Sequence, residues 1–433
     1  MTRRMTRLML WVLAGAALPM AAAAQDGRYA IRGGTVHTLA GPTLEGATIL
    51  LEGGRITAVG TDVAIPDGTE VIDATGRHVY PGLFNAFSQL GLQEINAVAV
   101  TNDVMELGTF NPQLVAATAV HPASERIPVT RANGVTHVLS APSARPGGIG
   151  GQASVINLDG WTVEEMLIEP SVGMVLNWPS IQTRRFNFQT FTVDNRPFGK
   201  AKQEAEEAVE RLREELNAAR RYRQAVSNGH EPRDLRLEAL ARVVAGELPV
   251  FILADEARDI RDAVAFATDE GLTMILVGGR DAGQETALLA EHDIPVLLRA
   301  TQNMPAHRDD SYHAAFDIAV RLREAGVRFA MTGWASAGPN PPSRTLAYEA
   351  ANAVKFGLPD EVALMAITRY PAEILGLDGD LGTIAVGKIG NLIVTDGDPL
   401  EIRTHIERVF INGHPVSTDN KHRRLYERYR ARR

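Results

Sequence analysis

Short runs of apolar and β-branched residues, separated by turn residues, fill the chain from Tyr29 to Val79. Breaks such as Gly33-Gly34 between these runs are typical of a small antiparallel sheet. The same pattern of short apolar and β-branched runs recurs between residues 391 and 413. Two β segments that flank a long middle predict one discontinuous domain. We therefore expect residues 25–80 and 382–420 to form the two parts of a β-sandwich.

The middle of the chain, residues 81–381, alternates apolar runs of strand length with segments of helical period, as a parallel βα array does. The predicted strands cover residues 136–140, 249–253, 273–277, 294–298 and 328–332. The predicted helices cover residues 257–270, 284–292, 313–325 and 343–356. Closure of such an array gives a TIM-type (β/α)8 barrel, so the predicted fold class is α/β with an added β domain.

Two charged segments stand apart from this alternation. Residues 200–227 are dense in Glu, Arg and Lys, with opposite charges three or four positions apart, which predicts a long solvated outer helix. A partner-binding surface is the alternative interpretation of this helix. Residues 421–433 hold seven Lys or Arg against one Glu. A frayed, solvated end explains this basic tail more simply than binding to a membrane or a partner.

The first 24 residues have the pattern of a secretory signal peptide. Three arginines precede an apolar run from Leu8 to Leu18, and a stretch of small residues ends at Ala24, near which we expect cleavage. An uncleaved membrane anchor is the alternative, but the apolar run is short and is followed by Pro19. We therefore expect a periplasmic or secreted protein with no membrane span after cleavage.

Composition narrows the chemistry of partners and cofactors. A net charge of -8 and a pI near 5.8 argue against nucleic acid as a partner, because binding it needs a basic surface. The chain has no cysteine, so an exported protein of this kind has to be stable through its core alone. Any bound metal would need His, Asp or Glu as ligands, since no thiolate is available.

The segment Pro81-Gly-Leu-Phe-Asn-Ala-Phe-Ser-Gln-Leu-Gly91 resembles the first barrel strand of the amidohydrolase superfamily, in its imidazolonepropionase-like branch. Further segments resemble the family in the same order along the chain: residues 33–37, 249–260, 357–376, 381–400 and 411–413. The resemblance implies a metal-dependent hydrolase of amide-like or cyclic carbon-nitrogen bonds, which uses zinc or another divalent metal. It also implies ligands at the carboxyl ends of barrel strands, where barrel enzymes hold their chemistry.

The expected metal ligands of the first strand are replaced. In the family this strand ends in His-x-His, which supplies two imidazoles to one divalent metal. Phe87 and Gln89 stand at these two positions, and Asn85 stands at the family's preceding Asp. A metal ion that binds to a protein loses water ligands, and a phenyl ring has no lone pair to replace them. A neutral amide oxygen is a poor replacement for imidazole at zinc.

The ligands of the later strands are replaced as well. By the resemblance, Leu253 stands at the position of the strand-five His and Gly278 at that of the next His. Gly333 stands where the family has the Asp that binds metal and acts as general base. A bridging carbamylated lysine is not expected, because Lys200 and Lys202, the only lysines before Lys355, belong to the charged helix. Without these groups the chain lacks the metal ligands and the general base that the family's usual mechanism needs. We therefore expect no metal cofactor.

Several residues remain candidates for a pocket at the barrel mouth. They are Asn85, His121, Trp161, Trp178, Asp309, His313 and Trp334. The tryptophans could line an apolar pocket for an aromatic or acyl group, and core packing is the alternative for each. Asp309 and His313 lie in a segment that suggests a metal site but is equally explained by a helix cap. For glycine-rich residues 142–152 the two interpretations are a backbone cradle for an anion and ordinary loop geometry.

Two hypotheses of function follow. In the first, the protein has lost ordinary hydrolysis and serves as a non-catalytic subunit or a small-molecule binder. A metal-bearing amidohydrolase paralogue or a second copy of the chain would be its partner. In the second, it is an active hydrolase of amides or cyclic amides, either with displaced metal ligands or working without metal. Those displaced ligands would come from Gln89, His121, Asp309 and His313.

Overall fold

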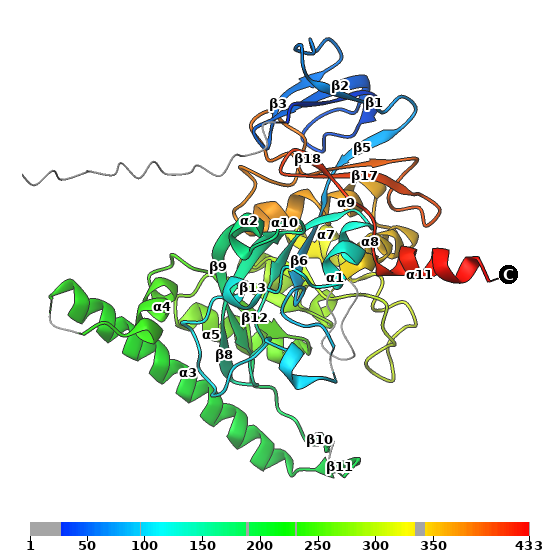
Figure 1. Ribbon diagram of the computed structural model, residues 1–433. Helices are drawn as coiled ribbons and strands as arrows, with labels where there is room; N and C mark the ends of the chain where they lie inside the picture. Colours follow the sequence, from blue (N-terminus) through cyan, green and yellow to red (C-terminus); the bar gives the residue numbers. More distant parts are fainter. Residues whose placement is uncertain (1–26, 96, 188–189, 230–231, 334–342, 433) are drawn as a thin grey trace, which may run out of the picture.

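The computed structural model describes residues 27–95, 97–187, 190–229, 232–333 and 343–432. Its chain forms two large sheets, one above the other, with a long helix crossing below them (Figure 1). The expected signal peptide and Trp334 lie outside the described residues. Within the described part of the chain, no helix is both long enough and apolar enough to cross a membrane.

The upper sheet combines strands from both ends of the chain. Its strand order is β18-β17-β16-β5-β1-β2-β3, with β4 beside β1. The strands from the first end are β1 (Tyr29–Val36), β2 (Leu44–Glu52), β3 (Arg55–Gly60), β4 (Glu70–Asp73) and β5 (His78–Pro81). Those from the second end are β16 (Leu392–Thr395), β17 (Ile406–Ile411) and β18 (His414–Val416). The two ends join where β5 pairs antiparallel with β16.

The lower sheet is a nearly closed, eight-stranded barrel of the TIM type, in the order β15-β14-β13-β12-β9-β8-β7-β6. Its strands are β6 (Leu83–Ser88), β7 (Val135–Ser140), β8 (Gly148–Asn157), β9 (Leu167–Asn177), β12 (Val250–Ala254), β13 (Met274–Gly278), β14 (Val296–Leu298) and β15 (Phe329–Met331). The gap between β6 and β15 is bridged by backbone, because Ile367 O accepts from Phe84 N at 2.8 Å and Ala366 O accepts from Met331 N at 2.9 Å.

A regular (β/α)8 repeat was expected, and the first part of the barrel departs from it. Strands β7, β8 and β9 are consecutive antiparallel neighbours, whereas β9, β12, β13, β14 and β15 are parallel. The glycine-rich residues 142–152 run into β8. A Cβ on Gly148 would lie 2.5 Å from Thr109 O, and one on Gly150 would lie 2.3 Å from Ser143 O. The glycines therefore allow close backbone packing, and residues 148–152 belong to the buried strand β8 and not to a loop.

The chain passes from the upper sheet into the barrel through Gly82 alone. This residue separates β5 from β6, and its N–H donates to Asn391 O at 2.8 Å. A Cβ on Gly82 would lie 2.1 Å from Thr136 Oγ1, so no larger residue fits without a shift. The crossing point is thus closely packed against Thr136 and tied by its N–H to Asn391.

The helices cover the barrel, and several differ in extent from the prediction. Helix α5 (Ala257–Asp269) agrees with its predicted span. Helix α7 (Ile318–Glu324) begins five residues later than expected, because residues 313–317 form turns in which Asp317 accepts from His313. The remaining helices are α1 (Arg126–Arg131), α2 (Val163–Met166), α4 (Leu235–Val244), α6 (Thr286–Glu291), α8 (Leu346–Lys355), α9 (Asp360–Met365) and α10 (Arg369–Ile374).

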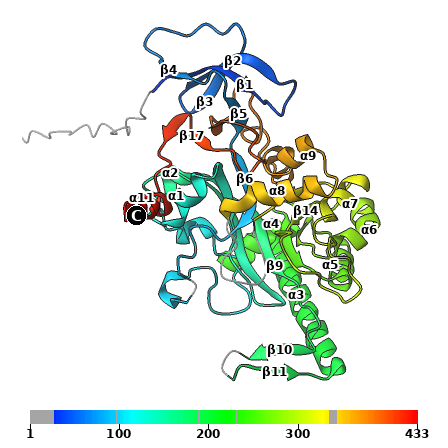
Figure 2. The same cartoon turned by 90° about the vertical axis from the view of Figure 1, so that its right-hand side faces the viewer.

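The long charged segment forms helix α3 (Phe198–Ser227), which follows a hairpin of β10 (Arg184–Asn187) and β11 (Thr192–Asn195). The hairpin and α3 together form an arm. Figure 2 shows the hairpin at the end of this arm, away from the barrel. The basic tail was expected to fray, but it forms helix α11 (Lys421–Arg430). Asn420 caps it by accepting from the N–H groups of His422 and Arg423.

Candidate functional site at the barrel mouth

Phe87 fills the barrel mouth at the end of β6. Its side chain is 2% exposed, and its ring stands edge-on to the ring of Phe251 with 6.2 Å between centroids. Both rings belong to a cluster of buried apolar side chains contributed by β6 to β9 and β12 to β15. Burial of two aromatic rings in such a cluster stabilises the fold and leaves the first expected ligand position without a lone pair.

Asn85, in the middle of β6, joins this strand to the segments that follow β15. Its Nδ2 donates to Ser343 Oγ at 2.9 Å, and its Oδ1 accepts from Gly333 N at 3.2 Å and from Phe87 N at 3.4 Å. The side chain is fully buried. A neutral amide offers both a donor and acceptor lone pairs, which a carboxylate does not. The family resemblance implied a carboxylate at position 85 and another at position 333. The chain has an amide at the first position and a glycine at the second, and the two residues are joined by a hydrogen bond.

Gln89 and Leu253 have structural partners of their own. The Gln89 Nε2 donates to Ser143 Oγ at 2.9 Å, which ties the end of β6 to the loop before β8. Leu253 packs, partly buried, against the same apolar cluster as Phe87. Neither side chain brings an imidazole or a carboxylate to the mouth.

Gly278 has a backbone conformation that a histidine would adopt only with strain. Its φ is +101°, and a Cβ would lie 2.8 Å from Asp255 Oδ1 and 3.2 Å from Ala254 O. Asp255 is not free to move aside, because its Oδ2 accepts from Arg299 Nη1 at 2.6 Å. The ligand that the resemblance implied at this position is therefore excluded by local geometry as well as by sequence.

A network of charged side chains flanks the apolar mouth, after strands β12, β13 and β14. Arg299 follows β14, is only 10% exposed and pairs with Asp255. Asp281 follows β13, and its Oδ2 lies 3.1 Å from His307 Nε2 and accepts from Ala257 N at 3.1 Å. The hydrogen bond to Asp281 raises the pKa of His307, because a nearby carboxylate favours the protonated imidazole. Opposite charges thus alternate along this rim.

Glu349 on α8 holds the loop that carries this network. Its Oε2 accepts from Thr301 N at 2.6 Å, from Thr301 Oγ1 at 2.9 Å and from Gln302 N at 3.3 Å. Burial raises the pKa of the Glu349 carboxyl, while these hydrogen bonds act in the opposite direction. The loop after β14 is therefore anchored by one buried side chain.

Beside this network lies a cavity of about 680 Å³. Its walls include Arg280, Asp281, Arg299, Thr301, Met304 and Asp309. Another cavity, of about 650 Å³, lies at the opposite end of the barrel, near residues such as Pro249 and Pro295 that precede the strands. Barrel proteins hold their chemistry at the carboxyl ends of the strands, so the cavity beside the mouth is the candidate site.

The predicted pocket residues do not gather in one place. Trp161 is 91% exposed, and the Trp178 ring packs edge-on to Phe266 in the core. His121 is exposed on its loop, and His313 Nδ1 lies 3.2 Å from Asp317 Oδ2. Asn85 lies at the mouth, and Asp309 lines the cavity described above. The residues suggested as displaced ligands thus lie in separate surroundings, and Gln89 and His313 have different side-chain partners.

The donor set does not fit the metal that the fold family implies. In residues 27–95, 97–187, 190–229, 232–333 and 343–432, no three His, Asp or Glu side chains are arranged to hold a metal ion. The sequence of residues 334–342, which lie outside the described ranges, contains no His, Asp or Glu. Divalent zinc needs three or four such ligands in a fixed geometry. The apolar groups and single amide at the mouth do not supply them.

Sequence reasoning missed Asp255 and Arg299, which belong to the charged rim, and Arg280, which lines the cavity beside it. Each lies within two residues of the end of a barrel strand. Charged residues directly after buried strands are a signal that could have found them, because the carboxyl ends of parallel strands meet at one edge. Their pairing depends on the arrangement of three separate strands.

Comparison with known proteins gives relatives over most of the chain. The model of the amidohydrolase family matches residues 285–418. Amidohydrolase tasK of Hapsidospora irregularis is 23% identical over 398 residues, which are 84% of this chain and 39% of that protein. The imidazolonepropionase of Maricaulis maris is 29% identical over 193 residues, 43% of this chain and 44% of that protein. The matches therefore span less than half the length of these two curated relatives.

A solved structure agrees over nearly the whole chain. The amidohydrolase from Thermotoga maritima has a TM-score of 0.76 and 26% identity, and the match covers 90% of this chain and 99% of that chain. The family model, the imidazolonepropionase relatives and this structure point to the same group. The chain belongs to the amidohydrolase superfamily, in its imidazolonepropionase-like branch.

Proposed function

We propose that this chain is an exported amidohydrolase-fold protein that binds a small molecule and does not carry out the metal-dependent hydrolysis of its family. The observation that carries the proposal is the contact between Phe87 and Phe251, whose rings fill the position where the family resemblance implies an imidazole. In this proposal the upper sheet is a β-sandwich domain, and the chain works in the periplasm as a non-catalytic subunit.

The cavity beside the mouth suggests the class of ligand. Arg280 and Arg299 line it together with the carboxylates of Asp281 and Asp309, so both signs of charge are present within one cavity. Met304 adds an apolar surface. A zwitterion with an apolar side chain, such as an amino acid or a short peptide, matches this lining, because guanidinium groups bind carboxylates and carboxylates bind ammonium groups.

Metal content and turnover test the loss of hydrolysis. The full chain, purified from its own periplasm, is analysed for bound metals and assayed on N-acyl amino acids and dipeptides. We expect metal far below one ion per chain and no turnover, with or without added zinc. One tightly held metal per chain together with turnover would show that the protein is an active hydrolase with displaced ligands.

Calorimetric titration with amino acids and dipeptides tests the ligand. We expect saturable binding that Arg280→Gln weakens by tenfold or more. The reason is that loss of a charged contact worth about 1.4 kcal/mol or more lowers the affinity by at least this factor. Arg403→Gln is the matched control, because Arg403 is exposed on the upper part of the molecule, away from the cavity. Unchanged affinity of the Arg280 variant, with both variants folded by circular dichroism, would place the ligand elsewhere.

A further inference from the structure

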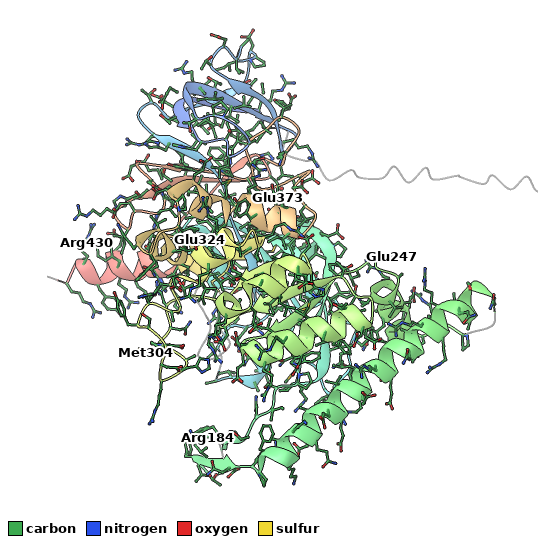
Figure 3. The ribbon with its side chains drawn as sticks, turned by 180° about the vertical axis from the view of Figure 1, so that it is seen from behind. Arg184, Glu247, Met304, Glu324, Glu373 and Arg430 are labelled. Atoms are coloured by element: carbon green, nitrogen blue, oxygen red, sulfur yellow. The ribbon has the colours of Figure 1, made fainter. Side chains whose placement is uncertain are left out.

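Helix α3 has a buried face and an exposed face with a regular stripe of polar residues. The buried face includes Leu212, Leu216 and Tyr222 and packs against α4 and the barrel. The exposed stripe follows steps of three and four residues, the spacing of one helix face. Its members are Gln203, Glu207, Glu210, Glu214, Asn217, Arg221 and Gln224. Figure 3 shows the helix lying along the outside of the molecule, with Arg184 at the tip of the arm.

Acidic residues of α3 are confined to its first part, whereas its last part carries only positive charge. Its six glutamates lie between residues 204 and 215, and this first part also holds four cations, Lys200, Lys202, Arg211 and Arg213. Three arginines with no further glutamate follow at positions 220, 221 and 223. The helix macrodipole favours this order of charges, but its effect falls off within the terminal turns, and Glu210 and Glu214 lie in the middle of the helix. Antiparallel alignment of the helix with a copy of itself would bring the glutamate part of each against the arginine part of the other.

Two members of the stripe have no ion-pair partner in the described part of the chain. Glu214 and Arg221 are both exposed, and neither makes a salt bridge or a side-chain hydrogen bond there. They lie seven residues apart on one face, a rise of about 10 Å, which is too far for them to pair with each other. Neighbouring charges differ in this respect, since Arg213 pairs with Glu210 and Arg220 pairs with Glu270.

Both ends of the arm expose apolar side chains. Phe186, Phe191 and Val193 of the hairpin are exposed, as is Phe198 at the start of α3. An isolated two-stranded hairpin is marginally stable in water, and contact with a further surface stabilises it. At the other end of α3, Val226 and Leu235 are exposed as well. Figures 1 and 2 agree that the hairpin lies at the far end of the helix from α4.

We propose that a second copy of this chain packs antiparallel on the α3 stripe, with the two-fold axis at Asn217. In this alignment Glu214 of each copy pairs with Arg221 of the other, and Glu210 faces Gln224. The phenylalanine hairpin of each copy then reaches the end of the arm that exposes Val226 and Leu235. The same surface serves both copies, which is the requirement for a closed dimer.

Sedimentation of the full chain tests the charge pairing. We expect a dimer, at least tenfold weaker dimerisation for Glu214→Arg, and recovery in Glu214→Arg combined with Arg221→Glu. Recovery by the double reversal distinguishes pairing across the axis from a general loss of charge balance. Arg403→Glu, an exposed charge reversal outside the arm, is the control and is expected to leave the dimer unchanged.

A single added cysteine tests the position of the axis, because the chain has none of its own. Under oxidation we expect Asn217→Cys to form a covalent dimer, since its two copies face each other on the axis. Gln203→Cys is the matched control on the same stripe. Its two copies would lie about 40 Å apart, beyond the reach of a disulfide.

Three outcomes would overturn the proposal. They are a monomeric full chain, cross-linking through Gln203→Cys in place of Asn217→Cys, and a double reversal that stays as weak as Glu214→Arg alone. A monomer that associates only with a metal-bearing paralogue would assign the arm to that other partner.

Discussion

Asn85 and Ser343 are 258 residues apart in sequence and are joined by a hydrogen bond of 2.9 Å. The same Asn85 amide accepts from the backbone N–H of Gly333, so one side chain fastens the first barrel strand to the chain that follows the last. In a barrel whose edge strands meet through the backbone of Ala366 and Ile367, this amide supplies a second closure at the mouth.

Replacement of this amide should loosen the closure. Asn85→Ala leaves the Ser343 hydroxyl and the Gly333 N–H without their partner, which should lower the free energy of unfolding by about 1–3 kcal/mol. Urea unfolding followed by circular dichroism measures the change. Asn228→Ala, an exposed asparagine, is the control and should have a far smaller effect. Equal effects of the two substitutions would contradict the closure by Asn85.

Asn85→Asp gives the closure a dependence on pH. Burial without a cation should raise the pKa of the new carboxyl in the folded state above its unfolded value. The neutral acid is then tolerated below the unfolded pKa, and stability relative to the native protein is lost as the pH rises through the folded pKa. The measurement is the difference in unfolding free energy between variant and native protein at pH 4 and pH 7. A smaller difference at pH 7 than at pH 4 would refute this sign.

The Phe87 ring should contribute to stability as a core residue does. Phe87→Ala removes a buried ring from contact with Phe251, and truncations of this kind cost about 3–5 kcal/mol. Trp161→Ala is the matched control, because that ring is 91% exposed. Thermal and urea unfolding of both variants gives the comparison. If Phe87→Ala were as mild as Trp161→Ala, the mouth would not be a packed core.

Substitutions at Gly278 and Gly271 should distinguish backbone strain from steric clash. Both have positive φ, at +101° and +64°, but only Gly278 has atoms within 4 Å of an added Cβ. Gly271→Ala should therefore cost about 1–2 kcal/mol from the backbone conformation alone. Gly278→Ala should cost more, because Asp255 is held in place by Arg299. Equal unfolding free energies for the two variants would show that Asp255 moves aside freely.

His137 should make the protein less stable in acid. Its imidazole is fully buried, and burial lowers the pKa of His137 to about 3 from an ordinary value of 6.5. As the pH falls below the pKa of His137 in the unfolded chain, the unfolded chain binds a proton and the folded chain does not. Stability therefore falls between about pH 6.5 and pH 3. His137→Asn should flatten this part of the stability profile, whereas exposed His121→Asn should leave it unchanged. A profile equally steep in all three proteins would contradict the assignment.

The sequence pattern predicted both sheets because alternation and glycine turns are local signals. It did not predict the antiparallel strands β7 to β9, because β8 begins in glycine-rich sequence that is also typical of a loop, and the direction of a strand is not encoded locally. The basic tail was expected to fray because the prediction used only its charge pattern. Asn420, which precedes that pattern, caps the helix and was not considered. The start of α7 was placed too early, because the pairing of Asp317 with His313 belongs to a turn.

The site was predictable only in part. The residues at the mouth were identified through a family resemblance that matched positions one by one. Their contacts were not, because Asn85, Gly333 and Ser343 meet only when the barrel closes. The charged rim was missed for the same reason, since Asp255 and Arg299 belong to different strands.

Gly82 is the whole of the connection between β5 and β6, and it is packed closely against Thr136. A one-residue junction held by a backbone hydrogen bond leaves no linker that could act as a hinge. The two sheets should therefore move as one rigid unit. If a ligand changes the shape of this protein, we expect the change to arise in the loops around the mouth, with the angle between the sheets preserved.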